Sequence, residues 1–105
     1  MRIIISTCKP DEADMISDTL LEERLIASCN IVPNITTKVR WKGEAVTQTE
    51  TLLIMRTRAE LMWKLERRLV ELNSFEVPEV ASFEIKEWNA RYFNWLYGAT
   101  KDPKE

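Results

Sequence analysis

The segment Phe75-Glu76-Val77-Pro78-Glu79 places two carboxylates around a proline. It lies between a strongly helical run and a run with the alternation of a strand. Val77 precedes proline, so its backbone is biased away from the helical region. Pro78 has no amide hydrogen and is expected at the first residue of the strand or on a sheet edge. Glu76 and Glu79 could together coordinate a hard divalent cation.

The same two glutamates also have a purely architectural interpretation. A solvated strand edge would carry them without any ligand, with one of them paired to an arginine. Arg56, at the end of a predicted strand, is the natural partner for either carboxylate. The local pattern leaves both interpretations open.

Cys8 and Cys29 are the only soft metal ligands, because the chain contains no histidine. Both are expected at strand ends, where a closed homo-oligomer could bring copies together. Tight zinc binding normally takes four nitrogen or sulfur ligands, which one chain cannot easily supply. A cysteine-plus-carboxylate site for Cu²⁺ stays open, since intrinsic affinity rises toward copper along the first row. The commoner fate of a free cysteine is a small buried hydrophobe.

Three aromatic residues, Trp41, Tyr92 and Trp95, could line a cleft between subunits and stack on a flat ligand. Together with Arg56 they would suit an organic anion or a nucleotide. The alternative is interface packing, because aromatic side chains dominate buried contacts whatever the function.

Composition excludes several classes of protein. A net charge of −2 and a pI near 5.3 argue against a nucleic-acid partner, which normally meets a basic face. No apolar run approaches the length of a membrane span, and the opening residues are too brief for a signal peptide, so a cytoplasmic protein is expected. Without histidine or a glycine-rich phosphate loop no catalytic constellation is visible, and no enzyme is predicted. No tightly bound cofactor is expected.

Hydrophobic periodicity predicts six core elements and a terminal helix within one domain, 1–105, with a flexible tail at about 100–105. The first helix opens at Lys9-Pro10-Asp11-Glu12 and buries Ala13, Ile16, Leu20 and Ala27. The second opens at a capping box, Thr57 to Glu60, before a buried leucine series. Asn89 is expected to cap the last helix, with Gly98 at its end.

The predicted order, β-α-β-β-α-β plus a helix, is an α+β, ferredoxin-like antiparallel sheet with helices on one face. Residues 35–41 and about 45–56 form two long strands joined at Lys42-Gly43. Strands of a dozen residues reach roughly 40 Å, whereas helices of sixteen residues cover about 24 Å. The hairpin is therefore expected to project beyond the helices, and a homo-oligomer would shelter it.

Five stretches of the chain match a known family pattern and occur in family order. They are Leu20-Leu21-Glu22-Glu23-Arg24-Leu25-Ile26-Ala27-Ser28-Cys29-Asn30-Ile31-Val32-Pro33, Trp41-Lys42-Gly43-Glu44, Leu52-Leu53-Ile54-Met55-Arg56-Thr57, Phe75-Glu76-Val77-Pro78-Glu79-Val80 and Tyr92-Phe93-Asn94-Trp95-Leu96. Through them the chain resembles the CutA divalent-cation tolerance family over nearly its whole length. The resemblance implies a ferredoxin-like protomer in a tight homotrimer, similar in build to the PII signalling proteins. It also implies binding of copper and other divalent ions, and a role in metal tolerance.

Two positions depart from the family pattern. Relatives usually carry a His-Pro pair where this chain has Asn73-Ser74, and often a cysteine where Ser28 stands, with Cys29 one place later here. A slip of one residue along a strand turns the side chain to the other face. Both metal-ligand positions that the resemblance suggests are therefore altered.

Overall fold

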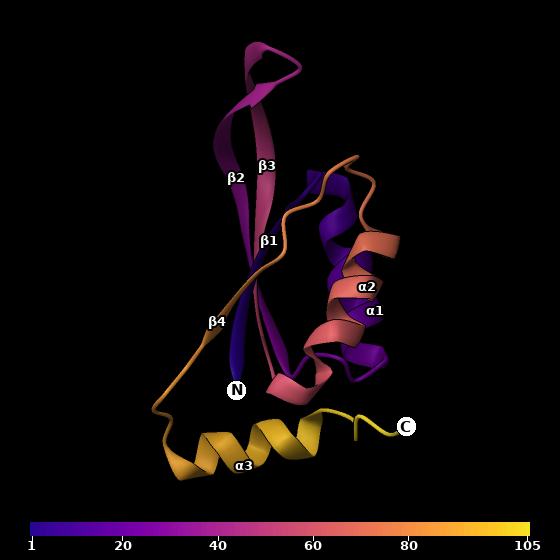
Figure 1. Ribbon diagram of the computed structural model, residues 1–105, viewed down its shortest axis with the longest axis vertical. Coiled ribbons are helices and arrows are strands. Elements are labelled where there is room, and N and C mark those ends of the chain that lie inside the picture. The colour runs from indigo at the N-terminus through magenta and orange to yellow at the C-terminus, as the bar shows by residue number, and fades with distance from the viewer.

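Four antiparallel strands form an open sheet in the order β2-β3-β1-β4, and this computed structural model describes all residues, 1–105 (Figure 1). Two helices cover one face of the sheet and a third lies across its lower end (Figure 1). The elements are β1 (Arg2–Cys8), the short 3-10 helix η1 (Pro10–Glu12), α1 (Ala13–Glu22), β2 (Ser28–Trp41), β3 (Glu44–Thr57), the 3-10 helix η2 (Ala59–Leu61), α2 (Met62–Leu72), β4 (Ala81–Glu84) and α3 (Ala90–Ala99). The predicted ferredoxin-like topology and its additional C-terminal helix are confirmed.

The core lies between the sheet and the pair α1 and α2. Alternate residues of the two central strands point into it, and Ile4, Leu53 and Met55 are fully buried. The helices contribute residues at helical spacing, such as Leu65 and Leu69 of α2. Buried residues recur every second position in the strands and every third or fourth position in the helices. This combination is what the packing of helices on one face of a sheet requires.

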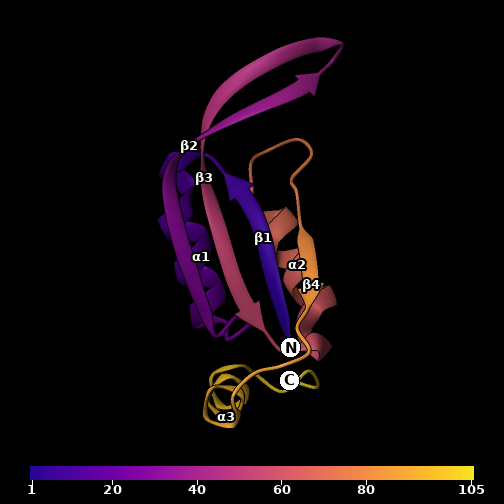
Figure 2. The ribbon, with the colours of Figure 1, turned by 90° about the vertical axis from the view of Figure 1, so that its left-hand side faces the viewer.

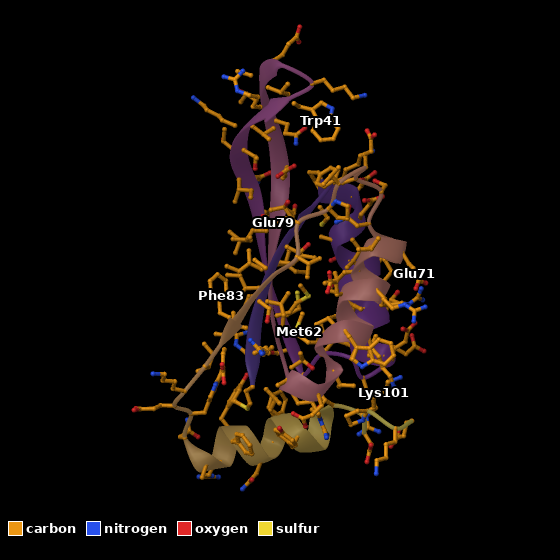
Figure 3. The ribbon with its side chains drawn as sticks, viewed as in Figure 1. Trp41, Met62, Glu71, Glu79, Phe83 and Lys101 are labelled. Atoms are coloured by element: carbon orange, nitrogen blue, oxygen red, sulfur yellow. The ribbon has the colours of Figure 1, made fainter.

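The opposite face of the sheet has no covering element. It presents the other alternate positions of the same strands, including Ile5 opposite Ile54 and Ile3 opposite Phe83. Phe83 is 49% exposed and its side chain points away from the helices (Figure 3). A contiguous apolar sheet face that is exposed to water typically marks a site of interaction with another protein surface.

The β2–β3 hairpin extends beyond the helical layer, as the strand and helix lengths predict, and the molecule measures 45 × 26 × 21 Å. A register shift between Val32 and Ile35 marks a bulge in β2, where Asn34 adopts a positive φ of 58°. Bulges bend a strand and increase its twist. The upper hairpin accordingly leans over the segment that leads into β4 (Figure 2). Lys42 and Gly43, both with positive φ, form the predicted turn.

The terminal helix α3 begins after Asn89, whose side chain accepts a hydrogen bond from the backbone N–H of Tyr92, as predicted. Its last carbonyls face two arginines: Arg24 donates to the carbonyl of Gly98, and Arg58 donates to the carbonyl of Tyr97. Cations at a helix C-terminus complement the dipole. These contacts dock α3 against the end of the sheet.

Several local predictions were wrong. Thr57 does not cap a helix: it ends β3, and its buried hydroxyl donates to the carbonyl of Leu25 at 2.7 Å. Ala27 is buried, but it lies beyond the end of α1. Pro78 precedes β4 by three residues and does not begin it, and Gly98 is the penultimate residue of α3, so the helix continues one residue past it. For Thr57 the reason is a tertiary partner, Leu25, that the local pattern does not show.

The last residues pack against the rest of the chain through Lys101, whose backbone N–H donates to the carbonyl of Arg24 at 2.9 Å. Lys64 of α2 donates to the carbonyls of Pro103 and Glu105. The flexibility of 100–105 and the extent of the domain stay predictions. None of the helices combines the length and the apolar character needed to cross a membrane.

Candidate functional site

A cleft of about 590 Å³ lies between the projecting hairpin and the segment that joins α2 to β4. This volume is in the range of small-ligand pockets. Three strips of chain line it: the end of β1, the inner side of the hairpin, and residues 74–79. The lining residues are Thr7, Lys9, Thr37, Val39, Trp41, Val46, Gln48, Glu50, Ser74, Phe75, Glu76, Val77 and Glu79.

The segment 73–79 is held by hydrogen bonds at both ends, which gives the cleft a defined wall. The Nδ2 group of Asn73 donates to the carbonyl of Thr7, and the hydroxyl of Ser74 donates to the Glu12 carboxylate, both at 2.9 Å. At the other end the buried hydroxyl of Ser6 donates to the carbonyl of Glu79 at 2.7 Å. A wall tied to β1 and to the start of α1 needs little ordering when a ligand binds.

Glu50 is the most deeply buried charged group of the cleft, with 3% of its surface exposed. One carboxylate oxygen accepts from the Thr37 hydroxyl at 2.7 Å and the other from the Gln48 amide at 2.7 Å. Both donors are neutral. The ion pairs of the protein join Arg68 to Glu23 and to Glu71, so none involves Glu50.

The cleft contains three of the eight residues that the sequence singled out: Glu76, Glu79 and Trp41. Trp41 lies near the hairpin end, and Glu79 lies on the segment below it (Figure 3). No three acidic or cysteine side chains lie close enough together to hold one metal ion within the protomer. The cleft's carboxylates are therefore spread along it.

Arg56 does not pair with Glu76 or Glu79, which corrects the partnership expected from the sequence. Its Nη1 group donates to Asn30 Oδ1 at 2.7 Å and to the Ser28 hydroxyl at 3.3 Å. These contacts tie β3 to β2 near the lower end of the sheet, away from the cleft. Ser28, where the family pattern often has cysteine, is thus occupied with the Arg56 side chain.

Cys8 and Cys29 are free thiols outside the cleft lining. Burial raises the pKa of Cys8 to about 11, helped by the charges of Glu12 and Glu50. Burial also raises the pKa of Cys29 to about 11, with a further increase from Cys8 and a decrease from Arg56. The thiolate is the metal-binding form, so both side chains are poorly prepared as ligands within the protomer.

Tyr92 and Trp95 lie on α3, and this helix lies at the opposite end of the long axis from the β2–β3 turn (Figure 1), next to which Trp41 ends β2. Tyr92 stacks on Trp88 with ring centroids 5.0 Å apart and contacts Trp95 at 5.4 Å. Trp95 is 51% exposed. Within one protomer the aromatic residues therefore form two separate groups, and only Trp41 belongs to the cleft.

Glu50 was missed by the sequence interpretation. A signal was present, because Glu50 continues the period-two series of Leu52 and Ile54 and so places a carboxylate in line with the apolar residues on one face of the strand. Glutamate is rarely buried among apolar residues of a strand unless its carboxylate has a partner or binds a ligand.

The chain is similar to known proteins in both sequence and structure. A sequence model of the family described as "CutA1 divalent ion tolerance protein" matches residues 2–99. The chain is 38% identical over 94 residues to the divalent-cation tolerance protein CutA of Thermus thermophilus, covering 90% of this chain and 91% of that one. It is 34% identical to the corresponding Pyrococcus horikoshii protein, with 94% and 98% covered.

Solved structures of proteins with the same family name also have the same fold as this chain. The divalent cation tolerance protein of Thermus thermophilus superposes with a TM-score of 0.90 at 37% identity, covering 96% of this chain and 100% of that one. A protein from Nostoc sp. PCC 7120, described as PII-like protein CutA, superposes with a TM-score of 0.91 at 27% identity, covering 96% and 98%.

Proposed function

Because the chain belongs to the CutA1 divalent ion tolerance family, we propose that it is a cytoplasmic homotrimer. It binds divalent metal ions, copper foremost, at or near the clefts between its subunits, and it catalyses no reaction. The observation that carries the proposal is the cleft whose lining includes the carboxylates of Glu50, Glu76 and Glu79 against a single lysine, Lys9.

Self-association is supported by the uncovered face of the sheet. Phe83 and Val32 are 49% and 38% exposed there, and both edge strands, β2 and β4, have an unpaired side. Burial of apolar surface contributes about 25 cal/mol per Å², so a partner covering this face would stabilise the protomer. A head-to-tail contact between copies closes into a ring under three-fold symmetry.

Metal binding at a seam between subunits is supported by the way the oxygen donors are spread. One protomer lacks a convergent set of three acidic or thiol ligands. A divalent ion at Glu76 or Glu79 would need further donors from water or from a neighbouring subunit. Copper fits a mixed set of this kind because its intrinsic affinity for nitrogen, oxygen and sulfur sites is the highest of the divalent first-row ions.

The oligomer is tested by light scattering on the purified protein at micromolar concentration. A mass three times that of the 12.3 kDa chain is expected, and a monomer would contradict the proposal. Replacing Phe83 by aspartate places a charge on the uncovered face and should shift the mass downward. The matched control is Val70→Asp, which changes an exposed residue of α2 outside both the sheet and the cleft and should leave the mass unaltered.

Metal binding is tested by calorimetry with Cu²⁺ on the wild type, Cys29→Ser and Glu79→Gln. The proposal predicts that Glu79→Gln lowers affinity. Unchanged heat and stoichiometry in Cys29→Ser would exclude Cys29 as a ligand, and a protein that takes up no divalent ion at all would overturn metal binding. A crystal soaked with copper and examined for anomalous scattering would locate the ion directly.

A second candidate function is a PII-like sensor of small molecules, favoured by the size of the cleft. The description of the Nostoc relative as PII-like points the same way. For an organic anion, however, the cleft has the wrong charge, and within the protomer Arg56 lies outside it. A thermal-shift screen of metabolites against metal ions separates the two functions, since a ligand of the native state raises the melting temperature.

A further inference from the structure

We propose that the cleft binds an extended organic polycation, an aliphatic polyamine, with Glu50 as the anchoring residue for one ammonium group. This inference goes beyond the proposed metal function and does not depend on it. It rests on the lining of the cleft, on the burial of Glu50 and on the spacing of the carboxylates.

The first observation is the uncompensated charge of Glu50. Its two hydrogen-bond donors, Thr37 and Gln48, are neutral, and each carboxylate oxygen still has accepting capacity. Burying a carboxylate without a cationic partner is costly, because desolvation is offset only by neutral hydrogen bonds. An ammonium group entering the cleft would supply both the missing charge and further donors.

The second observation is the spread of the acidic groups. A compact metal ion needs several oxygens at about 2.0–2.6 Å, and the protomer has no cluster of three acidic or cysteine side chains. Glu50, Glu76 and Glu79 nevertheless line one cleft of about 590 Å³. Several positive charges separated along a flexible chain can meet these separated carboxylates within one protomer, whereas a single ion would need further donors from water or from a neighbouring subunit. Lys9, the single cationic lining residue, leaves an excess of negative charge for the ligand.

The third observation is the apolar surface between the carboxylates. Val39, Val46, Phe75 and Trp41 line the same cleft and would contact methylene groups between the ammonium groups. Trp41 already has the ammonium nitrogen of Lys42 5.9 Å from its ring centroid, so its indole accepts cation–π contact. Metal ions and inorganic anions make no use of such walls, whereas an aliphatic amine uses both parts of the lining.

The test is calorimetry with spermidine on protein freed of metal by EDTA, comparing wild type, Glu50→Gln and the matched control Glu23→Gln. Glu23 carries the same charge but lies outside the cleft, in an ion pair with Arg68. Loss of a buried charge-assisted bond costs about 1.5–3 kcal/mol, so Glu50→Gln should weaken binding by about tenfold to a hundredfold. Glu23→Gln should change it by less than about twofold.

A second variant protects the test against misfolding of Glu50→Gln. Glu79→Gln alters an exposed rim residue and should weaken spermidine more than the monoamine butylamine, because only the longer ligand reaches a second carboxylate. Absence of heat with spermidine would overturn the proposal. So would equal affinities of Glu50→Gln and Glu23→Gln, which would show only nonspecific counterion binding. Because the protein is freed of metal beforehand, either result is independent of whether it binds divalent ions.

Discussion

The Nδ2 group of Asn73 donates a hydrogen bond to the carbonyl oxygen of Thr7 at 2.9 Å, joining the end of α2 to the end of β1. The Oδ1 atom of the same side chain accepts from the backbone N–H of Phe75 at 2.9 Å. Asn73 is 7% exposed, so it satisfies two backbone groups at the root of the cleft wall. It occupies the position at which the family pattern usually has histidine.

Replacing Asn73 by alanine should lower the free energy of unfolding by about 1–3 kcal/mol, because two part-buried backbone groups lose their partner. Urea denaturation followed by circular dichroism measures the change. Asn94→Ala is the matched control, since Asn94 is exposed on α3 and makes no side-chain hydrogen bond. Equal stabilities of the two variants would show that the Asn73 contacts contribute nothing.

Replacing Asn73 by histidine should strengthen Cu²⁺ binding, by about tenfold or more, because imidazole is a far better copper ligand than an amide. The side chain would lie between Thr7 and Ser74, which both line the cleft. Electron paramagnetic resonance would detect nitrogen coupling to the copper. Asn94→His adds the same group elsewhere on the surface, and an equal gain there would refute a site at the cleft.

The two thiols should make the protein less stable in alkali. The pKa of Cys8 and the pKa of Cys29 are both raised, from 9.0 to about 11. The folded protein therefore holds these protons more tightly than the unfolded chain. The stabilisation is complete below about pH 9 and is lost as the pH rises toward about 11.

Because Cys8 and Cys29 influence each other, the loss belongs to the pair and should be on the order of a few kcal/mol across this window. Urea denaturation at several pH values measures it. In the double variant Cys8→Ala, Cys29→Ala the fall in stability with pH should be shallower than in the wild type, whatever other groups titrate there. Parallel curves for the two proteins would contradict the prediction.

Replacing Arg58 by lysine should loosen α3 from the sheet. The Arg58 guanidinium lies 4.4 Å from the Tyr97 ring centroid and donates to the carbonyl of Tyr97 and to both oxygens of Thr100. Lysine cannot reproduce this planar set of donors. Backbone amides of residues 90–99 should exchange with deuterium faster, and stability should fall by about 1–3 kcal/mol.

The exchange experiment has a control on the same helix. Arg91→Lys changes an exposed arginine that makes no side-chain hydrogen bond or ion pair, so the protection of α3 should be unchanged. If Arg58→Lys protects α3 as well as the wild type does, the docking of this helix depends on its apolar side chains, such as the buried Leu96.

Elements with a strong period were predictable from the sequence. The Ile3-Ile4-Ile5 run, the leucine series of α2 and the alternation from Ile35 to Trp41 all correspond to elements of the structure. These patterns are local, since each residue only has to match neighbours two, three or four places away. The overhang of the hairpin followed from element lengths alone.

The hydrogen-bond partners of polar side chains could not be predicted from local patterns in the same way. Thr57 and Glu60 have the spacing of a capping box, yet the Thr57 hydroxyl bonds to Leu25. Arg56 was expected to pair with Glu76 or Glu79, yet it bonds to Asn30. In both cases the polar side chain has several possible hydrogen-bond partners in the sequence. Only the packing of the folded chain brings one of them within 3 Å.

The candidate site shows the same division. The order of the elements, the long hairpin and the acidic segment ending at Glu79 were determined by the sequence, because propensity and periodicity act over short stretches. The meeting of Glu50 with Glu76 and Glu79 was decided by tertiary structure. It requires a bulge near Asn34 that bends the hairpin and hydrogen bonds that hold 73–79 against β1. Each depends on contacts between residues far apart in the chain, which no local pattern encodes.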